Sequence, residues 1–159
     1  MAENSQQSTP VVAEHLRAWN PKAVESVLEF HGEITIVVPR ELLRAAAERL
    51  RDDANLQFNL LSDMTCVDRF PAEPRFELNY HLTSISRREK VRMRAAVSSD
   101  NPVADSVTSV WPGAGWMERE IFDLFGVRFT GHADLRRILL PDDWEGHPLR
   151  RDFPVEGQR

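Results

Sequence analysis

The sequence predicts an α+β fold: a two-layer single domain with a mixed, mainly antiparallel sheet and an irregular C-terminal extension. Residues 76–82 and 91–97 alternate apolar and polar side chains, with the period of strands buried on one face. Residues 42–50 instead place Leu and Ala on one helical stripe. Residues 112–154 carry glycines, prolines and aromatic residues in neither period, which indicates an irregular region.

The first third of the chain is expected to contain two helices and a strand. Residues 1–10, rich in Ser and Gln, are predicted to be a disordered tail. Asn20 and Pro21 form a helix start, an N-cap followed by proline at the first helical position, so a helix is predicted up to His31. Residues 33–38 are rich in β-branched side chains and predict a strand, and the helix with the apolar stripe follows it.

The middle of the chain is expected to contribute three strands, over residues 57–67, 76–82 and 91–97. A polar turn between the second and third predicts an antiparallel hairpin. Their alternation indicates a sheet with one face covered by helices and one face that is solvated or awaits a partner. The Asn-Pro pair at 101–102 repeats the helix-start pattern and predicts a further helix.

The last third is expected to begin with a short helix over residues 116–125, which Gly126 ends as a C-cap. The α+β core domain is therefore predicted to span residues 11–126. Residues 127–159 are predicted to form an extended C-terminal segment. Without a regular period this segment cannot bury its own aromatic side chains well, so we expect it to lie against its own domain or a partner.

Composition excludes several classes of function. The formal net charge of −5 and the pI near 5.5 leave no electrostatic basis for binding nucleic acid. A single cysteine, Cys66, can form no internal disulfide, as expected in a reducing cytoplasmic compartment, and cannot hold an iron–sulfur cluster by itself. No apolar run approaches the ~18 residues that cross a bilayer, so we expect any membrane association to be indirect, through partner subunits.

Glu118, Glu120 and Asp123 form an acidic cluster on the predicted short helix. Such a cluster can supply an acid/base pair or half of a metal site. Arg119 lies among these residues and can pair with Asp123 at a spacing of four residues. The sequence therefore favours ion pairing or an interface over chemistry.

The two histidines in this region, His132 and His147, match no zinc-binding spacing. Histidines in turns that bond the local backbone are the favoured interpretation. Cys66 is expected to be an inert, partly buried strand residue.

Paired arginines recur near the C-terminus. The pairs Arg136-Arg137 and Arg150-Arg151 could bind phosphate or anionic lipid, but neighbouring carboxylates nearly cancel their charge, which favours buried or interfacial Arg–carboxylate pairs. Trp144 and Phe153 are candidate anchors in an interface, or alternatively side chains that cover their own core.

Residues 118–154 together carry a long pattern of charged, glycine, proline and aromatic residues. Its members are Glu118, Arg119, Glu120, Asp123, Gly126, Phe129, Gly131, His132, Arg136, Arg137, Ile138, Leu139, Pro141, Asp143, Trp144, Glu145, Gly146, His147, Pro148, Leu149, Arg150, Asp152, Phe153 and Pro154. This pattern resembles the signature of the 30 kDa subunit family of respiratory complex I (NADH:quinone oxidoreductase, NDH-1), whose members form the C subunit of that complex.

The resemblance implies a non-catalytic structural subunit in the peripheral arm of a proton-translocating NADH:quinone oxidoreductase. It implies a hetero-oligomer in which the chain packs against the large quinone-site subunit (the D subunit), on the cytoplasmic side of the cell inner membrane. No cofactor is expected on this chain; FMN, iron–sulfur clusters and quinone are expected elsewhere in the assembled complex. The residues expected to hold the C-terminal segment to its domain or to the large quinone-site subunit are Glu118, Arg119, Glu120, Asp123, His132, Arg136, Arg137, Pro141, Trp144, His147, Arg150, Asp152 and Phe153.

Three alternatives remain open at this point. One is the equivalent subunit of a membrane-bound hydrogenase or related dehydrogenase. Another is a stand-alone carboxylate- or metal-dependent hydrolase that uses Glu118, Glu120, Asp123 and His132. The third is a free-standing binding domain.

Overall fold

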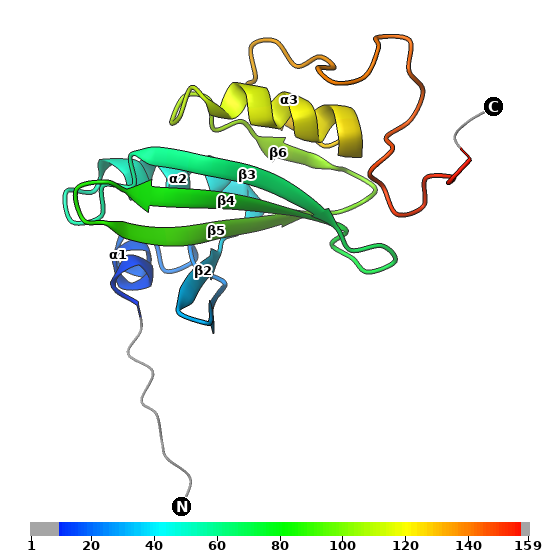
Figure 1. Cartoon of the computed structure of the whole chain (residues 1–159). Helices are drawn as coiled ribbons and strands as arrows, with labels where there is room; N and C mark the ends of the chain where they lie inside the picture. The colour runs from blue at the N-terminus through cyan, green and yellow to red at the C-terminus, as the bar shows by residue number, and fades with distance from the viewer. Residues whose placement is uncertain (1–9, 157–159) are drawn as a thin grey trace, which may run out of the picture.

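The fold is organised around a five-stranded sheet, which a computed structural model describes within residues 10–156 (Figure 1). Its strands lie in the order β1-β2-β5-β4-β3, and within it the β2–β5 pairing is parallel while the other three are antiparallel. This confirms the predicted mixed, mainly antiparallel sheet. The strand bounds are β1 Ser26–Phe30, β2 Glu33–Val37, β3 Leu60–Asp68, β4 Phe76–Ser84 and β5 Glu89–Val97.

The helices and a small second sheet complete the domain. Figure 1 shows α2 behind the sheet, and α3 above it next to β6. Strands β6 and β7 pair in parallel, although more than twenty residues separate them along the chain. The bounds are α1 Val11–Trp19, the 3-10 turn η1 Arg40–Leu42, α2 Leu43–Asp52, β6 Val103–Asp105, α3 Ala114–Phe125 and β7 Arg128–Thr130.

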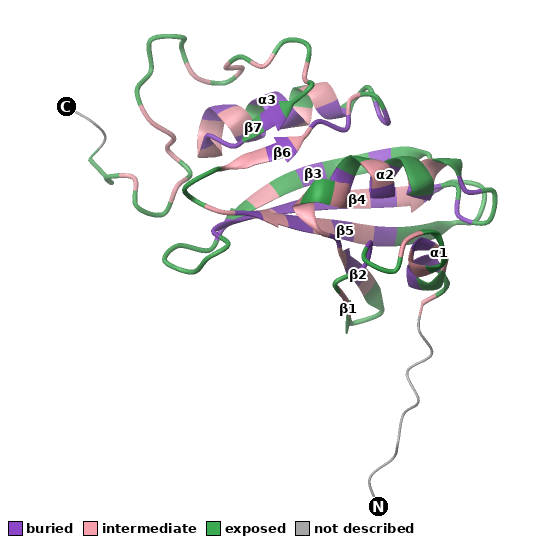
Figure 2. Ribbon diagram, turned by 180° about the vertical axis from the view of Figure 1, so that it is seen from behind, coloured by how far each residue is buried: buried purple, intermediate pink, exposed green. Residues whose placement is uncertain are grey.

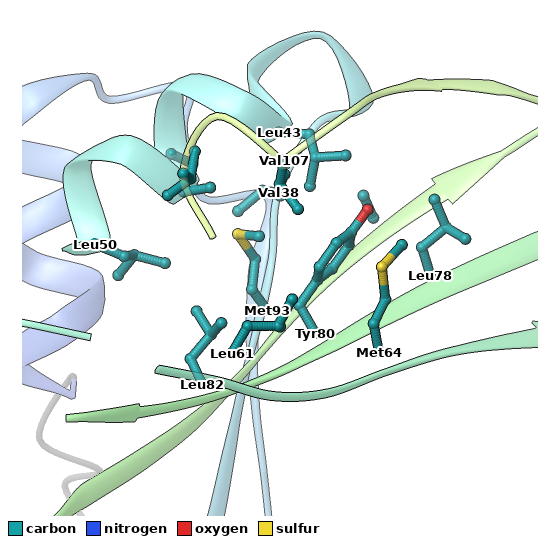
Figure 3. Close-up of a cluster of buried hydrophobic side chains, with 14 of the residues drawn as sticks. Val38, Leu43, Leu50, Leu61, Met64, Leu78, Tyr80, Leu82, Met93 and Val107 are labelled. Carbon is teal, nitrogen blue, oxygen red and sulfur yellow. The ribbon is translucent and has the colours of Figure 1, made fainter. Parts of the chain in front are cut away.

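The two faces of the main sheet differ in burial. Leu78, Tyr80 and Leu82 of β4 are buried in a cluster that also contains Leu43 and Leu50 of α2 (Figure 3). The alternate side chains of β4 lie on the opposite face and are partly exposed, apart from Asn79, which is buried. Figure 2 shows buried and intermediate residues along β4. The period-2 pattern of the sequence therefore identified the core face correctly.

The helix predicted from Pro21 to His31 is wrong. A helix ends just before this region, and Asn20 accepts a hydrogen bond from the N–H of Lys22 at 3.0 Å, so that it forms a turn and not an N-cap. The chain then enters β1, which pairs with β2 through the two-residue turn His31-Gly32. Pairing with the next strand outweighs a helical spacing that rested on three apolar residues.

The helix predicted after Asn101-Pro102 is also wrong. Residues 103–105 form β6 instead, because β7 supplies a parallel partner. This partner lies too far along the chain for the local sequence pattern to indicate it. Val107 and Trp111 are buried, as expected for apolar residues, but within a turn. The Trp111 indole N–H donates to the carbonyl of Phe58 at 3.1 Å.

The predicted tail, residues 1–10, lies outside the described residues except for Pro10. The predicted division between a core at 11–126 and a segment at 127–159 stays a prediction. Pairing of β7 with β6 continues to Thr130, so the irregular part that the structure describes is residues 131–156, here called the C-terminal loop. None of the helices within residues 10–156 has the length and apolar character needed to span a bilayer.

Candidate functional site

The C-terminal loop contains turns but neither helix nor strand. Figure 1 draws it in orange and red, passing over α3 and down toward the end of the main sheet. Polar backbone groups of such a loop need partners from elsewhere in the protein. Side chains from α3 and from the ends of β3 and β4 supply them.

Asp123 is the central residue of this arrangement. Its side chain is fully buried, and Oδ2 accepts hydrogen bonds from the consecutive N–H groups of Ile138 (3.0 Å), Leu139 (2.8 Å) and Leu140 (2.9 Å). Oδ1 accepts from Nη1 of Arg137 at 2.6 Å. Three backbone dipoles and one guanidinium therefore surround a single carboxylate.

These contacts keep Asp123 ionised. Burial alone would raise the pKa of its carboxyl. The hydrogen bonds from Leu140, from Arg137 and from the two intervening N–H groups together outweigh burial, so the pKa lies below its usual value. The negative charge on Asp123 is thus available to the loop at neutral pH.

Arg119 lies one helical turn before Asp123 and binds the same stretch of the loop. Its Nε and Nη2 donate to the carbonyls of Arg136 (3.1 Å) and Arg137 (2.8 Å), while its guanidinium lies over the ring of Trp116, 5.4 Å from the centroid. The predicted pairing of Arg119 with Asp123 is therefore wrong. Both charged groups are directed at the loop backbone and not at each other.

The C-terminal loop also satisfies the end of α3. The last carbonyls of a helix have no partner within it and favour positive charge. Here three of them are bonded by the loop. The bonds join His147 Nδ1 to Asp123 O (2.9 Å), Leu149 N to Leu124 O (3.1 Å) and Arg150 Nε to Phe125 O (2.6 Å).

Gly126 makes this close approach possible. It is the C-cap of α3, as predicted, with a left-handed φ of 75°. A Cβ at this position would lie 2.5 Å from Nη2 of Arg150 and 2.5 Å from Nε2 of His147. Glycine is required here both for the backbone conformation and for space.

A second attachment point lies at the end of the main sheet. Arg75, largely buried, donates to both carboxylate oxygens of Asp68 at 2.8 Å and to those of Asp152 at 3.0 and 2.6 Å. The N–H of Arg151 donates to Asp68 at 2.8 Å. Burial would raise the pKa of Asp68, but Arg75 and backbone donors bring it down to about 2.

The sequence analysis identified Asp152 but missed Asp68 and Arg75. Both flank strands, and nothing in the local pattern distinguishes them from exposed charges such as Arg69, which pairs with Glu77 at the surface. A weak signal existed, since an acidic and a basic residue bracket the loop between two predicted strands.

The acidic cluster does not form one site. Glu118 points into the protein, where Ser106 Oγ and the Val107 N–H donate to it at 2.7 Å each, and burial raises its pKa. Glu120 is exposed, and Asp123 faces the loop. Among the described residues, no group of three or more His, Cys, Asp or Glu side chains is placed to hold a metal ion.

His132 bonds backbone groups on both sides of its ring. Nδ1 accepts from the N–H of Asp134 at 3.0 Å, so the proton lies on Nε2, which donates to the carbonyl of Gly115 at 3.0 Å. The carboxylate of Glu118 lies 4.0 Å from the same nitrogen. These contacts join the start of the loop to the start of α3.

The outer side of the loop is apolar in part. Leu139 is 61% exposed, Leu149 52% and Trp144 41%, while Phe153 is half-buried and Pro141 exposed. Backbone and charged groups thus point inward, and large apolar side chains face solvent. Such a surface is typical of a site that contacts another protein.

Residues 36–159 match the model of the family described as "Respiratory-chain NADH dehydrogenase, 30 Kd subunit". The chain belongs to this family. Two relatives, each named as the C subunit of NADH-quinone oxidoreductase, illustrate the match. The protein of Roseiflexus sp. (strain RS-1) is 47% identical over 144 residues, 91% of this chain and 83% of the relative. That of Geotalea uraniireducens (strain Rf4) is 40% identical over 157 residues, 99% of this chain and 93% of the relative.

Two solved structures share this fold. A trypsin-resistant fragment (1-134) of Nqo5 is 30% identical with a TM-score of 0.66, over 78% of this chain and 96% of the fragment. A chain of an archaeal membrane-bound sulfane sulfur reductase has a TM-score of 0.75 over 91% of this chain and 84% of its own, but at 24% identity it shows the fold alone. The predicted 30 kDa subunit family is confirmed, over the hydrogenase-type, hydrolase and binding-domain alternatives.

Proposed function

We propose that this chain is a non-catalytic structural subunit in the peripheral arm of a proton-translocating NADH:quinone oxidoreductase. It supports the quinone-site module by packing against the large quinone-site subunit. Electrons pass from NADH through FMN and iron–sulfur clusters to quinone on other subunits, and this chain holds none of these groups. Its place is on the cytoplasmic side of the cell inner membrane, reached through its partners.

The observation that carries the proposal is the two-sided C-terminal loop. Its inner side is fixed by buried charged groups, and its outer side presents Leu139, Trp144 and Leu149 to solvent. A preorganised surface with aromatic and aliphatic anchors loses little conformational entropy when it binds a partner. The loop therefore suits a permanent contact with a neighbouring subunit.

The bonds of the signature residues support a structural role. Arg119, Asp123 and Arg137 are all engaged in fixing the loop, with donors and acceptors matched at 2.6–3.1 Å. A group that acts on a substrate needs a free donor or acceptor in an accessible cleft. The charges of Arg119, Asp123 and Arg137 are explained by loop attachment without any reaction.

Adjacent arginines allow a matched test. Arg137 donates to Asp123 and, through Nη2, to the carbonyls of Trp144 (2.9 Å) and Gly146 (3.2 Å). Arg136 pairs with exposed Asp134 at the surface. In a tagged copy purified from its native membranes in mild detergent, Arg137→Ala is expected to reduce the recovery of the large quinone-site subunit about ten-fold or more. Arg136→Ala is the control and should assemble normally.

NADH:quinone turnover per assembled complex completes the test. We expect the Arg137→Ala complexes that still form to turn over at the normal rate. Normal assembly with turnover specifically lost would contradict a structural role and indicate chemistry on this chain. Recovery of the wild-type chain as a lone 18.2 kDa protein would remove the proposal altogether.

A further inference from the structure

The two edge strands of the main sheet, β3 and β1, differ in how they are covered and in the regularity of their pairing. At one edge, α3 packs against β3, and the pairing of β3 with β4 shifts register between Leu61 and Asp63. At the other edge, β1 pairs with β2 in an unbroken register, and no other strand within residues 10–156 pairs with β1. Figure 2 shows β1 at the end of the sheet that is remote from α3. A regular, uncovered edge strand exposes backbone groups that can pair with another chain.

The turn that joins β1 to β2 determines which backbone groups point outward. His31 and Gly32 both have positive φ, 49° and 78°, which is the type I′ geometry of a two-residue hairpin. In this turn the flanking pair, Phe30 and Glu33, is the hydrogen-bonded one. Because bonded pairs alternate along an antiparallel ladder, the N–H and C=O groups of Val27 and Glu29 point away from β2.

The side chains of β1 extend this edge into a recognisable surface. Phe30 is 73% exposed and Leu28 46%, and both lie on the sheet face that the helices leave open, opposite Glu33 and Thr35 of β2. Glu29 is exposed on the other face. Within its paired residues the strand has no proline, lysine or bulge, the usual devices that prevent edge pairing.

We propose that the free edge of β1 is a second interaction site, which accepts an extended strand from a partner subunit. The partner strand carries apolar side chains against Leu28 and Phe30 and a lysine or arginine against Glu29, since opposite charges across strands attract. A second copy of this chain fits poorly, because its own β1 would bring another set of acidic side chains, Glu25 and Glu29, to the same edge. The proposal rests on the proposed function, which supplies the partner.

Hydrogen exchange tests the backbone part of this inference. The full chain would be compared alone and within the purified oxidoreductase, with residue-level detection of the Val27 and Glu29 amides. We expect exchange at these two amides to slow about ten-fold or more in the complex, because a partner strand now accepts their hydrogen bonds. A chain that assembles in the complex but leaves both amides exchanging at the isolated rate would overturn the inference and leave the proposed function intact.

Variants at Glu29 distinguish strand pairing from unspecific burial. Glu29→Pro removes the outward N–H, which an edge strand tolerates, and Glu29→Gln retains it. We expect Glu29→Pro to lower the recovery of the complex roughly five-fold relative to Glu29→Gln, while the isolated variant keeps the thermal midpoint of wild type.

If Glu29→Pro shifts the thermal midpoint, Glu29→Lys is used in place of the proline variant. Reversing the charge at this position should also lower the recovery of the complex roughly five-fold. Normal recovery of the folded Pro variant or of the Lys variant would overturn the inference, as would a dimer of the isolated chain with protected amides.

Discussion

The main sheet and the C-terminal loop are held by different forces. Leu78 and Leu82 of β4 are buried among other apolar side chains, each contributing about 1.5–3 kcal/mol by leaving water. The loop instead depends on buried ions, chiefly Asp123 with Arg137 and Arg75 with Asp68. Apolar packing is non-directional and tolerates replacement by residues of similar volume. A buried carboxylate with four donors accepts one geometry only.

This difference explains why the loop is built from charged residues. A buried ion pair adds little net stability relative to apolar side chains of the same size, because removing two charges from water is costly. Leaving one of the two charges unpaired, however, is strongly unfavourable. The loop therefore has one well-defined position, although it lacks helix and strand. A precise outer surface is what an obligate contact needs.

The largest expected effect comes from removing the charge at the centre of the loop contacts. Asp123→Asn leaves Arg137 partly buried without its anion and weakens three backbone hydrogen bonds. We expect the attachment of the loop to weaken by about 3 kcal/mol. The amides of residues 138–140 should then exchange roughly a hundred-fold faster. Exposed Glu120→Gln on the same helix is the control. Unchanged exchange in Asp123→Asn would mean that the charge does not hold the loop.

A smaller effect is expected at the helix end, where the loop and the sheet domain meet. Gly126→Ala puts a Cβ into left-handed backbone and against Arg150 and His147. We expect a loss of about 2 kcal/mol in the free energy of unfolding by urea. Gly113→Ala is the matched control, because a Cβ there meets nothing within 4 Å and φ is −61°. If both variants unfold at the same urea concentration, the close approach at Gly126 is not important.

The sequence predicted the structure where it depends on local burial, and failed where it depends on a partner elsewhere in the chain. The hairpin of β4 and β5 was predicted closely, because alternation of apolar side chains is a local consequence of burial on one face. The region 21–31 was not, since the partner that makes Ser26–Phe30 a strand comes after the turn. Likewise β6 is a strand because it pairs with β7, which lies more than twenty residues further along the chain.

The sequence named some of the residues that hold the C-terminal loop but not their geometry, and their part in a partner interface stays a prediction. The signature pattern pointed to Arg119, Asp123 and Arg137, all of which hold the C-terminal loop. Their partners could not be assigned, because helical spacing suggested a pair one turn apart while the actual bonds cross 14 to 18 residues. Arg75 and Asp152, 77 residues apart, meet only once the sheet has formed.

At the second attachment point, the contribution of Asp68 to the free energy of unfolding should depend on pH. The pKa of Asp68 is about 2 in the folded protein, below its ordinary value of 3.8. A depressed pKa adds stability that is present above about pH 4 and is lost as pH falls through about 2. The shift corresponds to about 2 kcal/mol.

Urea unfolding of wild type and Asp68→Asn at several pH values between 6 and 2 measures this contribution. We expect the difference in the free energy of unfolding between wild type and Asp68→Asn to shrink by more than half from pH 6 to pH 2. The control Asp143→Asn, at an exposed position, should have the same pH dependence of unfolding as wild type. Parallel profiles for Asp68→Asn and wild type would mean that Arg75 and the loop stabilise the protein without the Asp68 charge.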